Sequence, residues 1–570
     1  MSHNYEEWSK ERLVAHLVKL ENTLRNTRRG LPTIQQHADQ SDLPPTPSGS
    51  NFASHKATKE FRFSDHPTRK IALKFAYDGT HYNGLEHQRD VTPLPTVEET
   101  LWDALVKTRL VDPASDFDGH GWEKCGRTDR GVSAAGQVVS FWVRCKERGH
   151  PQRDAAAVPE APGSTLHKSS NDQQALLPPD DVDGSEFSDG LEALSGWDEP
   201  PTNTTLPVTS PGALSQTQEF DYVSLLNGVL PLTLRVLSWS PVEPTFSARF
   251  NCRGRHYKYF FVSRGLNIEA MREGARRLVG EHDWRNLCKV DPAKFRLDAE
   301  GEDRWSFRRV VKSAEVNPVQ PSSHSALSLE RDDEGYGELF VFDLIGNAFL
   351  YNQVRHIMAI LFLIGTGLEQ PSIITALLNV DASNPYPPYK SDEPMPPIVM
   401  GKPTYQMADA LPLILWDCQY DTDDVKWVGD IHVCSDDDGL DSDVQKKNPA
   451  DVNGLYAELR SVHERSRVQT TLHAHFLKAA SQYHMPPREL LPLPHPSSKL
   501  SPVPIPNGTV LGIPLGGGTH RNTRYTGGRG YVRLLDRKRL DEIPVIWDRW
   551  KNGKGAKAKR RGASEGPIIN

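Results

Sequence analysis

The chain carries at residues 124–134 the sequence Lys-Cys-Gly-Arg-Thr-Asp-Arg-Gly-Val-Ser-Ala, which leads into the apolar, β-prone segment 137–144. Gly126 and Gly131 flank Asp129. Because glycine adopts backbone angles that other residues resist, such a loop can turn tightly and expose one carboxylate. Thr-Asp-x-Gly is also ordinary turn chemistry, in which the aspartate caps a backbone amide. The loop alone therefore leaves two interpretations open, a presented carboxylate or a simple turn.

Further blocks accompany this loop in a fixed order along the chain. They are Tyr77-Asp78-Gly79-Thr80, then Phe246-Ser247-Ala248-Arg249-Phe250 with Arg255-His256-Tyr257-Lys258-Tyr259, and finally Gly346-Asn347-Ala348-Phe349-Leu350-Tyr351-Asn352-Gln353-Val354-Arg355. Together with the G-R-T-D-x-G-V loop, these blocks resemble the tRNA pseudouridine synthase A family. Finer features, such as residues 286–289 (Asn-Leu-Cys-Lys) and 413–418 (Leu-Ile-Leu-Trp-Asp-Cys), resemble its eukaryotic branch, the tRNA pseudouridine-38/39 synthases.

The resemblance implies a catalytic site around Asp129 that needs no cofactor and no metal. In the family, the aspartate of this loop is the nucleophile that converts uridine in tRNA to pseudouridine, and a nucleophilic carboxylate must be ionised. By the same resemblance, Arg355 is its partner, and a neighbouring guanidinium is expected to lower the pKa of the Asp129 carboxyl group. A structural salt bridge is the alternative role of Arg355, and the two roles are compatible.

Three other residues match substrate-binding positions of the family. Tyr257 matches the tyrosine that stacks on the target base. Arg127 matches an arginine that helps fill the space left when the target nucleotide leaves the stack, a movement needed to reach a paired base. Leu411 matches an apolar pocket wall. Packing alone is the alternative role of Tyr257, as a strand aromatic, and of Leu411, as a core residue. Residues 84–88 depart from the Gly-Trp-Gln common in bacterial members, which bears on site choice rather than on catalysis.

Periodicity predicts an α+β fold. The expected strands are 70–77, 137–144, 234–239, 255–263, 306–315 and 338–345, and the expected helices are 97–107, 222–229, 268–279 and 350–364. The period-two rule places Tyr257, Tyr259 and Phe261 on one face of their strand. The pattern is compatible with two ferredoxin-like halves. The resemblance implies in addition that their sheets join around a central basic RNA-binding cleft with Asp129 at its floor.

Composition divides the chain into six segments. They are an N-terminal amphipathic helix (1–27), a disordered linker (28–67), the N-terminal catalytic half (68–263) with a disordered insertion (146–218), the C-terminal half (264–427), a polar linker with a helix near 452–483 (428–510), and a basic C-terminal extension (511–570). In the first segment, Leu13, Leu17, Leu20 and Leu24 form a coiled-coil-like seam that could pair with another chain or dock on the core.

The formal net charge of −7 is unevenly distributed. Residues 155–218 hold ten acidic residues and one basic residue, and residues 421–452 hold ten Asp and three Lys. In contrast, residues 521–561 hold fourteen Lys or Arg against four acidic residues. A basic segment gains RNA affinity by neutralising phosphates, although a charge run is also typical of a solvated surface.

Several classes of protein are disfavoured. Six cysteines lie far apart without a C-x-x-C pair, which argues against a zinc site or a disulfide framework. The apolar run 357–364 is far below the roughly 20 residues of a membrane span. The acidic N-terminus lacks the apolar core of a secretion signal. The basic residues 554–561 match a nuclear localisation pattern, so we expect a protein of the nucleus and cytoplasm.

We therefore expect a cofactor-independent tRNA pseudouridine synthase that acts on uridines 38 and 39 of the anticodon stem-loop. The expected partner is tRNA, with no membrane, and the resemblance also implies a possible homodimer. A sister enzyme with other target uridines and a non-catalytic tRNA-binding protein of the same fold are the alternatives. A metal-dependent nuclease would need clustered carboxylates, and the aspartate-rich residues 436–443 have the composition of a linker.

Overall fold

The computed structural model describes residues 61–89, 91–146, 219–291, 306–319, 338–428, 454–485, 492, 531–541 and 543–555. The expected helix 1–27, nearly all of the linker 28–67, the insertion after residue 146, much of segment 428–510 and most of the basic extension lie outside these ranges. The predictions for those segments stay predictions.

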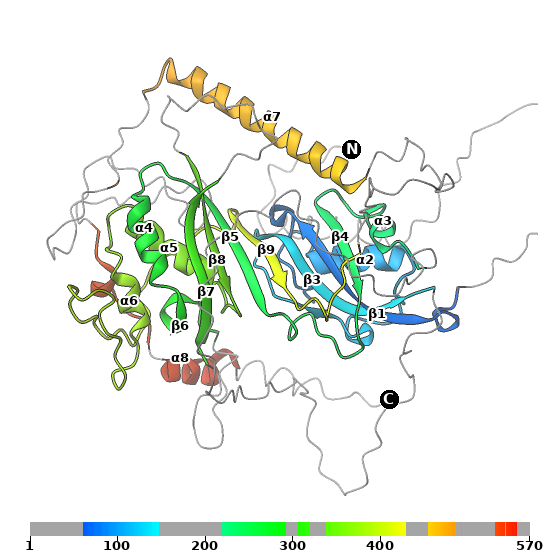
Figure 1. Ribbon diagram of the computed structural model, residues 1–570, viewed down its shortest axis with the longest axis horizontal. Coiled ribbons are helices and arrows are strands. Elements are labelled where there is room, and N and C mark those ends of the chain that lie inside the picture. The colour runs from blue at the N-terminus through cyan, green and yellow to red at the C-terminus, as the bar shows by residue number, and fades with distance from the viewer. Residues whose placement is uncertain are drawn as a thin grey trace, which may run out of the picture. The chain divides into compact units, whose positions relative to one another are not determined.

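A nine-stranded sheet forms the centre of the α+β fold (Figure 1). Its order is β4-β1-β3-β9-β5-β8-β7-β6, with β2 paired to β3. The strands are β1 (Thr68–Tyr77), β2 (Glu123–Lys124), β3 (Ser133–Arg144), β4 (Leu234–Pro241), β5 (Gly254–Val262), β6 (Gly280–Asp283), β7 (Arg308–Pro318), β8 (Leu339–Gly346) and β9 (Leu413–Gln419). Among the described strands, β3 and β9 pair in parallel and the other pairs are antiparallel. Strand β9 thus joins β3, which follows the Asp129 loop, to β5.

The described ranges also hold several helices. They are α2 (Val97–Lys107), α3 (Tyr222–Asn227), α4 (Ile268–Arg276), α5 (Gln353–Gly365), α6 (Ile373–Leu378), α7 (Leu455–Ser481) and α8 (Ile543–Trp550). In Figure 1, α2 and α3 accompany β1, β3 and β4, whereas α4, α5 and α6 accompany β6, β7 and β8. None of the helices in the described ranges combines the length and the apolar character needed to cross a membrane.

Most predicted elements are confirmed, with shifted ends. Helix α2 has the expected bounds, and the Thr96 side chain caps it by accepting from the Glu99 amide. Helix α5 begins at Gln353 rather than 350, because Asn352 adopts a left-handed backbone with φ 59°. The helix near 452–483 is confirmed as α7. Strands β2, β6 and β9 and helix α6 were not predicted, since each is too short to show a clear period.

The predicted face of β5 packs against helix α5. The rings of Tyr259 and Phe261 lie 6.0 and 5.7 Å from Phe362, both edge-on. Along α5, nearly every residue after Arg355 is buried. Each fully buried large apolar side chain stabilises the fold by roughly 1.5–3 kcal/mol. Helix α5 is therefore firmly anchored and gives Arg355, in its first turn, a fixed position.

Part of the basic C-terminal extension packs on the central α+β body. Tyr531 and Leu534 are fully buried. The Tyr531 hydroxyl and the Leu534 amide both donate to Oε1 of Glu369, at 2.8 and 2.7 Å. Arg539 also forms a β-bridge with Pro403. Residues 531–541 are therefore structural as well as basic.

Candidate active site

The loop that carries Asp129 lies between β2 and β3 and is held by close contacts. Gly131 has φ 83°, a conformation that side chains disfavour. Gly84 packs so closely on the loop that a Cβ there would lie 3.2 Å from the Thr128 carbonyl oxygen. The Thr128 hydroxyl hydrogen bonds to the Tyr77 hydroxyl at 2.6 Å. This confirms a tight loop, and the carboxylate of Asp129 has a defined place.

Asp129 and Arg355 are brought together, as expected. Nη1 of Arg355 lies 3.6 Å from Oδ2 of Asp129. The guanidinium is oriented by its Nε, which donates to the Ala408 carbonyl at 2.9 Å. The side chain of Arg355 is 11 % exposed and that of Asp129 is 26 % exposed. The ion pair is thus partly shielded from water and remains open on the aspartate side.

Burial raises the pKa of the Asp129 carboxyl group above its usual value. Arg355 opposes this effect, first by its charge and then by hydrogen bonding, and Lys289 opposes it more weakly. The expectation that the arginine lowers the pKa of Asp129 is confirmed for its own contribution, and the effect of burial outweighs it. Desolvation of a carboxylate favours the protonated form, so ionisation of Asp129 depends on these cations.

Tyr257 lies in β5, opposite Leu415 of β9 and Leu344 of β8. It is only 8 % exposed, and its ring meets Phe349 edge-on at 5.1 Å. Burial raises the pKa of its phenol, so the hydroxyl stays neutral. The structure therefore gives Tyr257 the packing role and leaves its contact with a base as a prediction.

Arg127 pairs with Glu86. Its Nη2 lies 2.6 Å from Oε1 of Glu86, and Lys124 lies 3.4 Å from the same oxygen. The Arg127 side chain is 62 % exposed. Glu86 belongs to the segment 84–88, where the chain departs from the bacterial pattern, so this departure provides the carboxylate that holds Arg127.

Leu411 is 52 % exposed, which contradicts the core-packing alternative. It follows Ala410, whose Cβ lies 3.4 Å from the place where a Cβ on Gly131 would stand. The same segment supplies the Ala408 carbonyl that accepts from Arg355. Residues 408–411 therefore border the Asp129 loop, with the apolar Leu411 side chain open to solvent.

Two side chains near Asp129 had been given no role from the sequence. Asn352 lies directly before α5, and its amide nitrogen can donate to both carboxylate oxygens of Asp129. Lys289 follows the 3-10 turn η5 (Arg285–Leu287), and its ammonium lies 4.9 Å from the ring centroid of Tyr351. Both residues belong to blocks that carried the resemblance. Their position in those blocks was the available signal, whereas the contact with Asp129 is a matter of tertiary structure.

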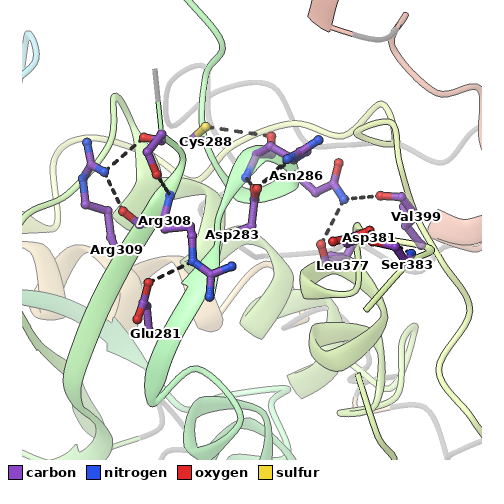
Figure 2. A network of polar contacts seen from close by, with 12 residues as sticks. Glu281, Asp283, Asn286, Cys288, Arg308, Arg309, Leu377, Asp381, Ser383 and Val399 are labelled. Carbon is purple, nitrogen blue, oxygen red and sulfur yellow. Dashed lines mark hydrogen bonds and ion pairs between the residues drawn. The ribbon is translucent and has the colours of Figure 1, made fainter. Parts of the chain in front are cut away.

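Hydrogen bonds of the Asn286 side chain hold the turn that carries Lys289. The Asn286 side-chain nitrogen donates to the carbonyls of Leu377 and Val399, at 2.9 and 2.7 Å (Figure 2). The Lys289 amide donates to the Tyr351 carbonyl at 2.8 Å, next to Asn352. The turn is therefore tied both to α6 and to the segment that precedes α5.

A partly buried lysine supports the same turn. Nζ of Lys402 donates to the Cys288 carbonyl at 2.6 Å and lies 3.0 Å from Nε2 of His356. Burial, followed by the charges of Lys402 and Arg355, lowers the pKa of His356 to about 2. Burial also lowers the pKa of Lys402 to about 8. His356 is thus neutral and adds no charge beside Arg355.

Comparison with known proteins identifies the class to which this fold and site belong. The family model described as tRNA pseudouridine synthase matches residues 275–421. The tRNA pseudouridine(38/39) synthase of Saccharomyces cerevisiae is 33 % identical over 418 residues, which cover 73 % of this chain and 72 % of the yeast protein. A probable tRNA pseudouridine synthase of Caenorhabditis elegans is 35 % identical over 381 residues, covering 67 % and 74 %.

The mammalian relatives are longer. The tRNA pseudouridine(38/39) synthase of Mus musculus is 37 % identical over 384 residues, and this alignment covers 67 % of the chain and 62 % of the mouse protein. The chain thus spans about three fifths of that relative. From the family model and these relatives, the chain belongs to the tRNA pseudouridine synthase family.

Proposed function

We propose that this protein isomerises uridine to pseudouridine at positions 38 and 39 of tRNA. The observation that carries the proposal is the partly shielded Asp129 carboxylate paired with Arg355, in a chain of the tRNA pseudouridine synthase family. The positions come from the names of the yeast and mouse relatives. A sister enzyme would share this pair and differ in target uridine.

The reaction asks little of the protein beyond one nucleophile. The C1′–N1 bond of uridine breaks, the uracil rotates, and a C1′–C5 bond forms as the C5 proton is lost and N1 gains one. Asp129 acts as the nucleophile in its ionised form. Arg355 maintains that form against desolvation. Because the product is an isomer of the substrate, the residues in this site need no redox partner.

Substrate entry requires the target nucleotide to leave the stack. In the proposal, Arg127 occupies the space left behind and exchanges its partner Glu86 for RNA as it does so. The exposed Leu411 forms an apolar wall of the pocket. Tyr257 supports the base from β5, which requires a small opening of the Phe349 contact.

The wider architecture in the proposal is that of two ferredoxin-like halves joined at β3 and β9 around a basic cleft. The parallel pairing of Ser133 with Ile414 supports a junction close to the catalytic loop. Arg127, Arg130 and Lys289 are exposed cations near Asp129 in this arrangement. The proposal also includes tRNA as the partner, a homodimer, no membrane partner, and location in the nucleus and cytoplasm.

Replacement of the nucleophile tests the function. We expect Asp129→Asn to abolish pseudouridine at positions 38 and 39, measured by chemical mapping of tRNA treated with purified protein. Asp381→Asn is the matched control, since Asp381 is exposed and caps only its own loop through Ser383. Pseudouridine at other positions alone would favour the sister enzyme. Binding without any product in the wild type would favour the non-catalytic protein.

A further inference from the structure

Asn352 stands out by its backbone. In the described ranges, it and Arg109 are the non-glycine residues with positive φ, at 59° and 54°. A left-handed conformation costs free energy for an L residue, and asparagine is among those that adopt it most readily. Such strain persists where the surrounding structure over-determines it, and it clusters at functional sites. The left-handed conformation of Asn352 therefore indicates that a contact of this residue stabilises it.

The Asn352 side chain makes such a contact with Asp129. With its amide nitrogen turned toward Asp129, Asn352 donates to Oδ1 at 3.3 Å and also contacts Oδ2. A carboxylate can only accept hydrogen bonds, so the opposite orientation would place two acceptors against each other. Arg355 reaches Oδ2 from the first turn of α5 at 3.6 Å. Two donors from one helix start thus meet the same carboxylate.

The backbone around Asn352 is held independently of this contact. Its carbonyl accepts from the His356 amide at 3.0 Å, which begins α5. The Leu350 amide donates to Oε1 of Gln353 at 2.7 Å, which closes the preceding turn. The left-handed turn can therefore survive loss of the Asn352 side chain when the replacement accepts a positive φ.

We propose that Asn352 is a positioning residue, whose side-chain amide holds the Asp129 carboxylate in the orientation from which it attacks the ribose. The inference rests on the proposed function and names a residue that this function does not require by itself. Arg355 meets the carboxylate on one oxygen, which leaves rotation about the side-chain bond free. Asn352 contacts both oxygens and fixes that rotation. Positional error of about 1 Å can cost roughly 100-fold in rate.

The charges around Asp129 explain why a neutral donor suits this position. Arg355 from α5 and Lys289 from the turn after η5 already oppose the effect of burial. Two carboxylates on the adjoining segments have partners of their own, since Asp409 accepts from the Leu411 amide and Glu86 pairs with Arg127 and Lys124. A third cation would make the carboxylate a weaker nucleophile. An amide adds orientation and favours the ionised form through hydrogen bonding alone.

Two variants separate the side chain from the backbone. Asn352→Gly keeps the left-handed turn and removes the amide, whereas Asn352→Asp keeps the size and places a second carboxylate beside the first. Arg109→Gly is the matched control, because it makes the same change at the other left-handed residue, in the loop after α2. Rates are measured under single turnover with saturating tRNA, from acidic to mildly alkaline pH.

We expect Asn352→Gly to lower the rate roughly 10- to 100-fold at neutral pH. Its acid limb should lie at higher pH than that of the wild type, because loss of a hydrogen bond to the charged form raises the pKa of Asp129. Asn352→Asp should be slower still and shifted further, since two neighbouring carboxylates disfavour joint ionisation. Affinity for tRNA should stay within twofold, because many phosphate contacts carry it. Arg109→Gly should match the wild type throughout.

An unchanged rate and acid limb for Asn352→Gly would overturn the inference, and so would a slower rate with an unmoved acid limb. If the wild type makes no pseudouridine, the proposed function fails, and the contact between Asn352 and Asp129 is then tested without an activity assay. The Asp129 carboxyl carbon is followed by carbon-13 NMR as pH is varied. Its resonance is assigned as the one that is missing from the spectrum of Asp129→Asn. A titration that moves to higher pH in Asn352→Gly supports the contact. An identical titration refutes it.

Discussion

Replacing Arg355 by methionine should expose how far Asp129 depends on its cation. At the observed 3.6 Å, a unit charge pair at an effective dielectric constant of about 20 interacts by about 4–5 kcal/mol. Breaking a buried pair by removing one partner commonly costs a similar ~3–5 kcal/mol. Asn352 and Lys289 remain and offset part of this loss. We expect the single-turnover rate at neutral pH to fall roughly 100- to 1,000-fold.

The pH dependence of Arg355→Met gives the sharper test. Burial already raises the pKa of Asp129 and Arg355 is its main opponent, so the variant should raise that pKa further. Activity requires the ionised form, so the acid limb moves to higher pH and part of the lost rate returns as pH rises. Arg276→Met, at the exposed end of α4, is the control and should behave as the wild type.

Stability should follow the same linkage. A carboxyl group with a raised pKa in the folded state holds its proton to higher pH than the unfolded chain does, so stability falls as pH rises through that window. The window begins near the usual aspartate pKa of about 4 and widens in Arg355→Met. Its Tm deficit should therefore grow between mildly acidic and neutral pH. An unmoved acid limb together with a pH-independent Tm deficit would refute the electrostatic role of Arg355.

Two further predictions concern residues outside the catalytic pair. Leu534→Ala should lower the free energy of unfolding by ~2–5 kcal/mol, because Leu534 is fully buried where the C-terminal segment packs on the core. The exposed Leu540→Ala should change it little, and equal denaturation midpoints for the two variants would contradict the docking. Glu86→Gln should weaken the ion pair with Arg127 and change the relative rates at positions 38 and 39 without abolishing turnover, as measured by pseudouridine mapping. An unchanged ratio of the two rates would show that this ion pair does not affect site choice.

The sequence was most informative where local rules decide the structure. Helix α2 shows a clear apolar period and a threonine cap, and both of its ends were predicted correctly. Strand β5 alternates cleanly, and the common face of Tyr257, Tyr259 and Phe261 is confirmed. Strand β9 was missed, because seven residues with an apolar start carry no distinctive period. Its place between β3 and β5 is set by pairing, which no local pattern records.

In the candidate site too, the residues that form a motif could be predicted, and the properties that depend on tertiary structure could not. A motif could nominate Asp129 and Arg355, and the structure brings them together. The net direction of the Asp129 pKa could not be read from the motif, since it depends on how much water the folded chain excludes. The contact of Asn352 depends on one left-handed residue, a conformation that glycine would have signalled and asparagine does not.

These contacts also determine when the site can form. Asp129 comes from the loop before β3, whereas Arg355 and Asn352 come from the start of α5, far along the chain. Strands β3 and β9 meet where Ser133 and Ala134 pair with Ile414 and Leu415, and the segment just before β9 supplies the Ala408 carbonyl that orients Arg355. Pairing of β9 with β3 therefore sets the geometry of the Asp129–Arg355 ion pair. A chain in which β9 has not yet paired with β3 would hold Asp129 without its cation, and any burial of that carboxyl group would then favour its protonated form.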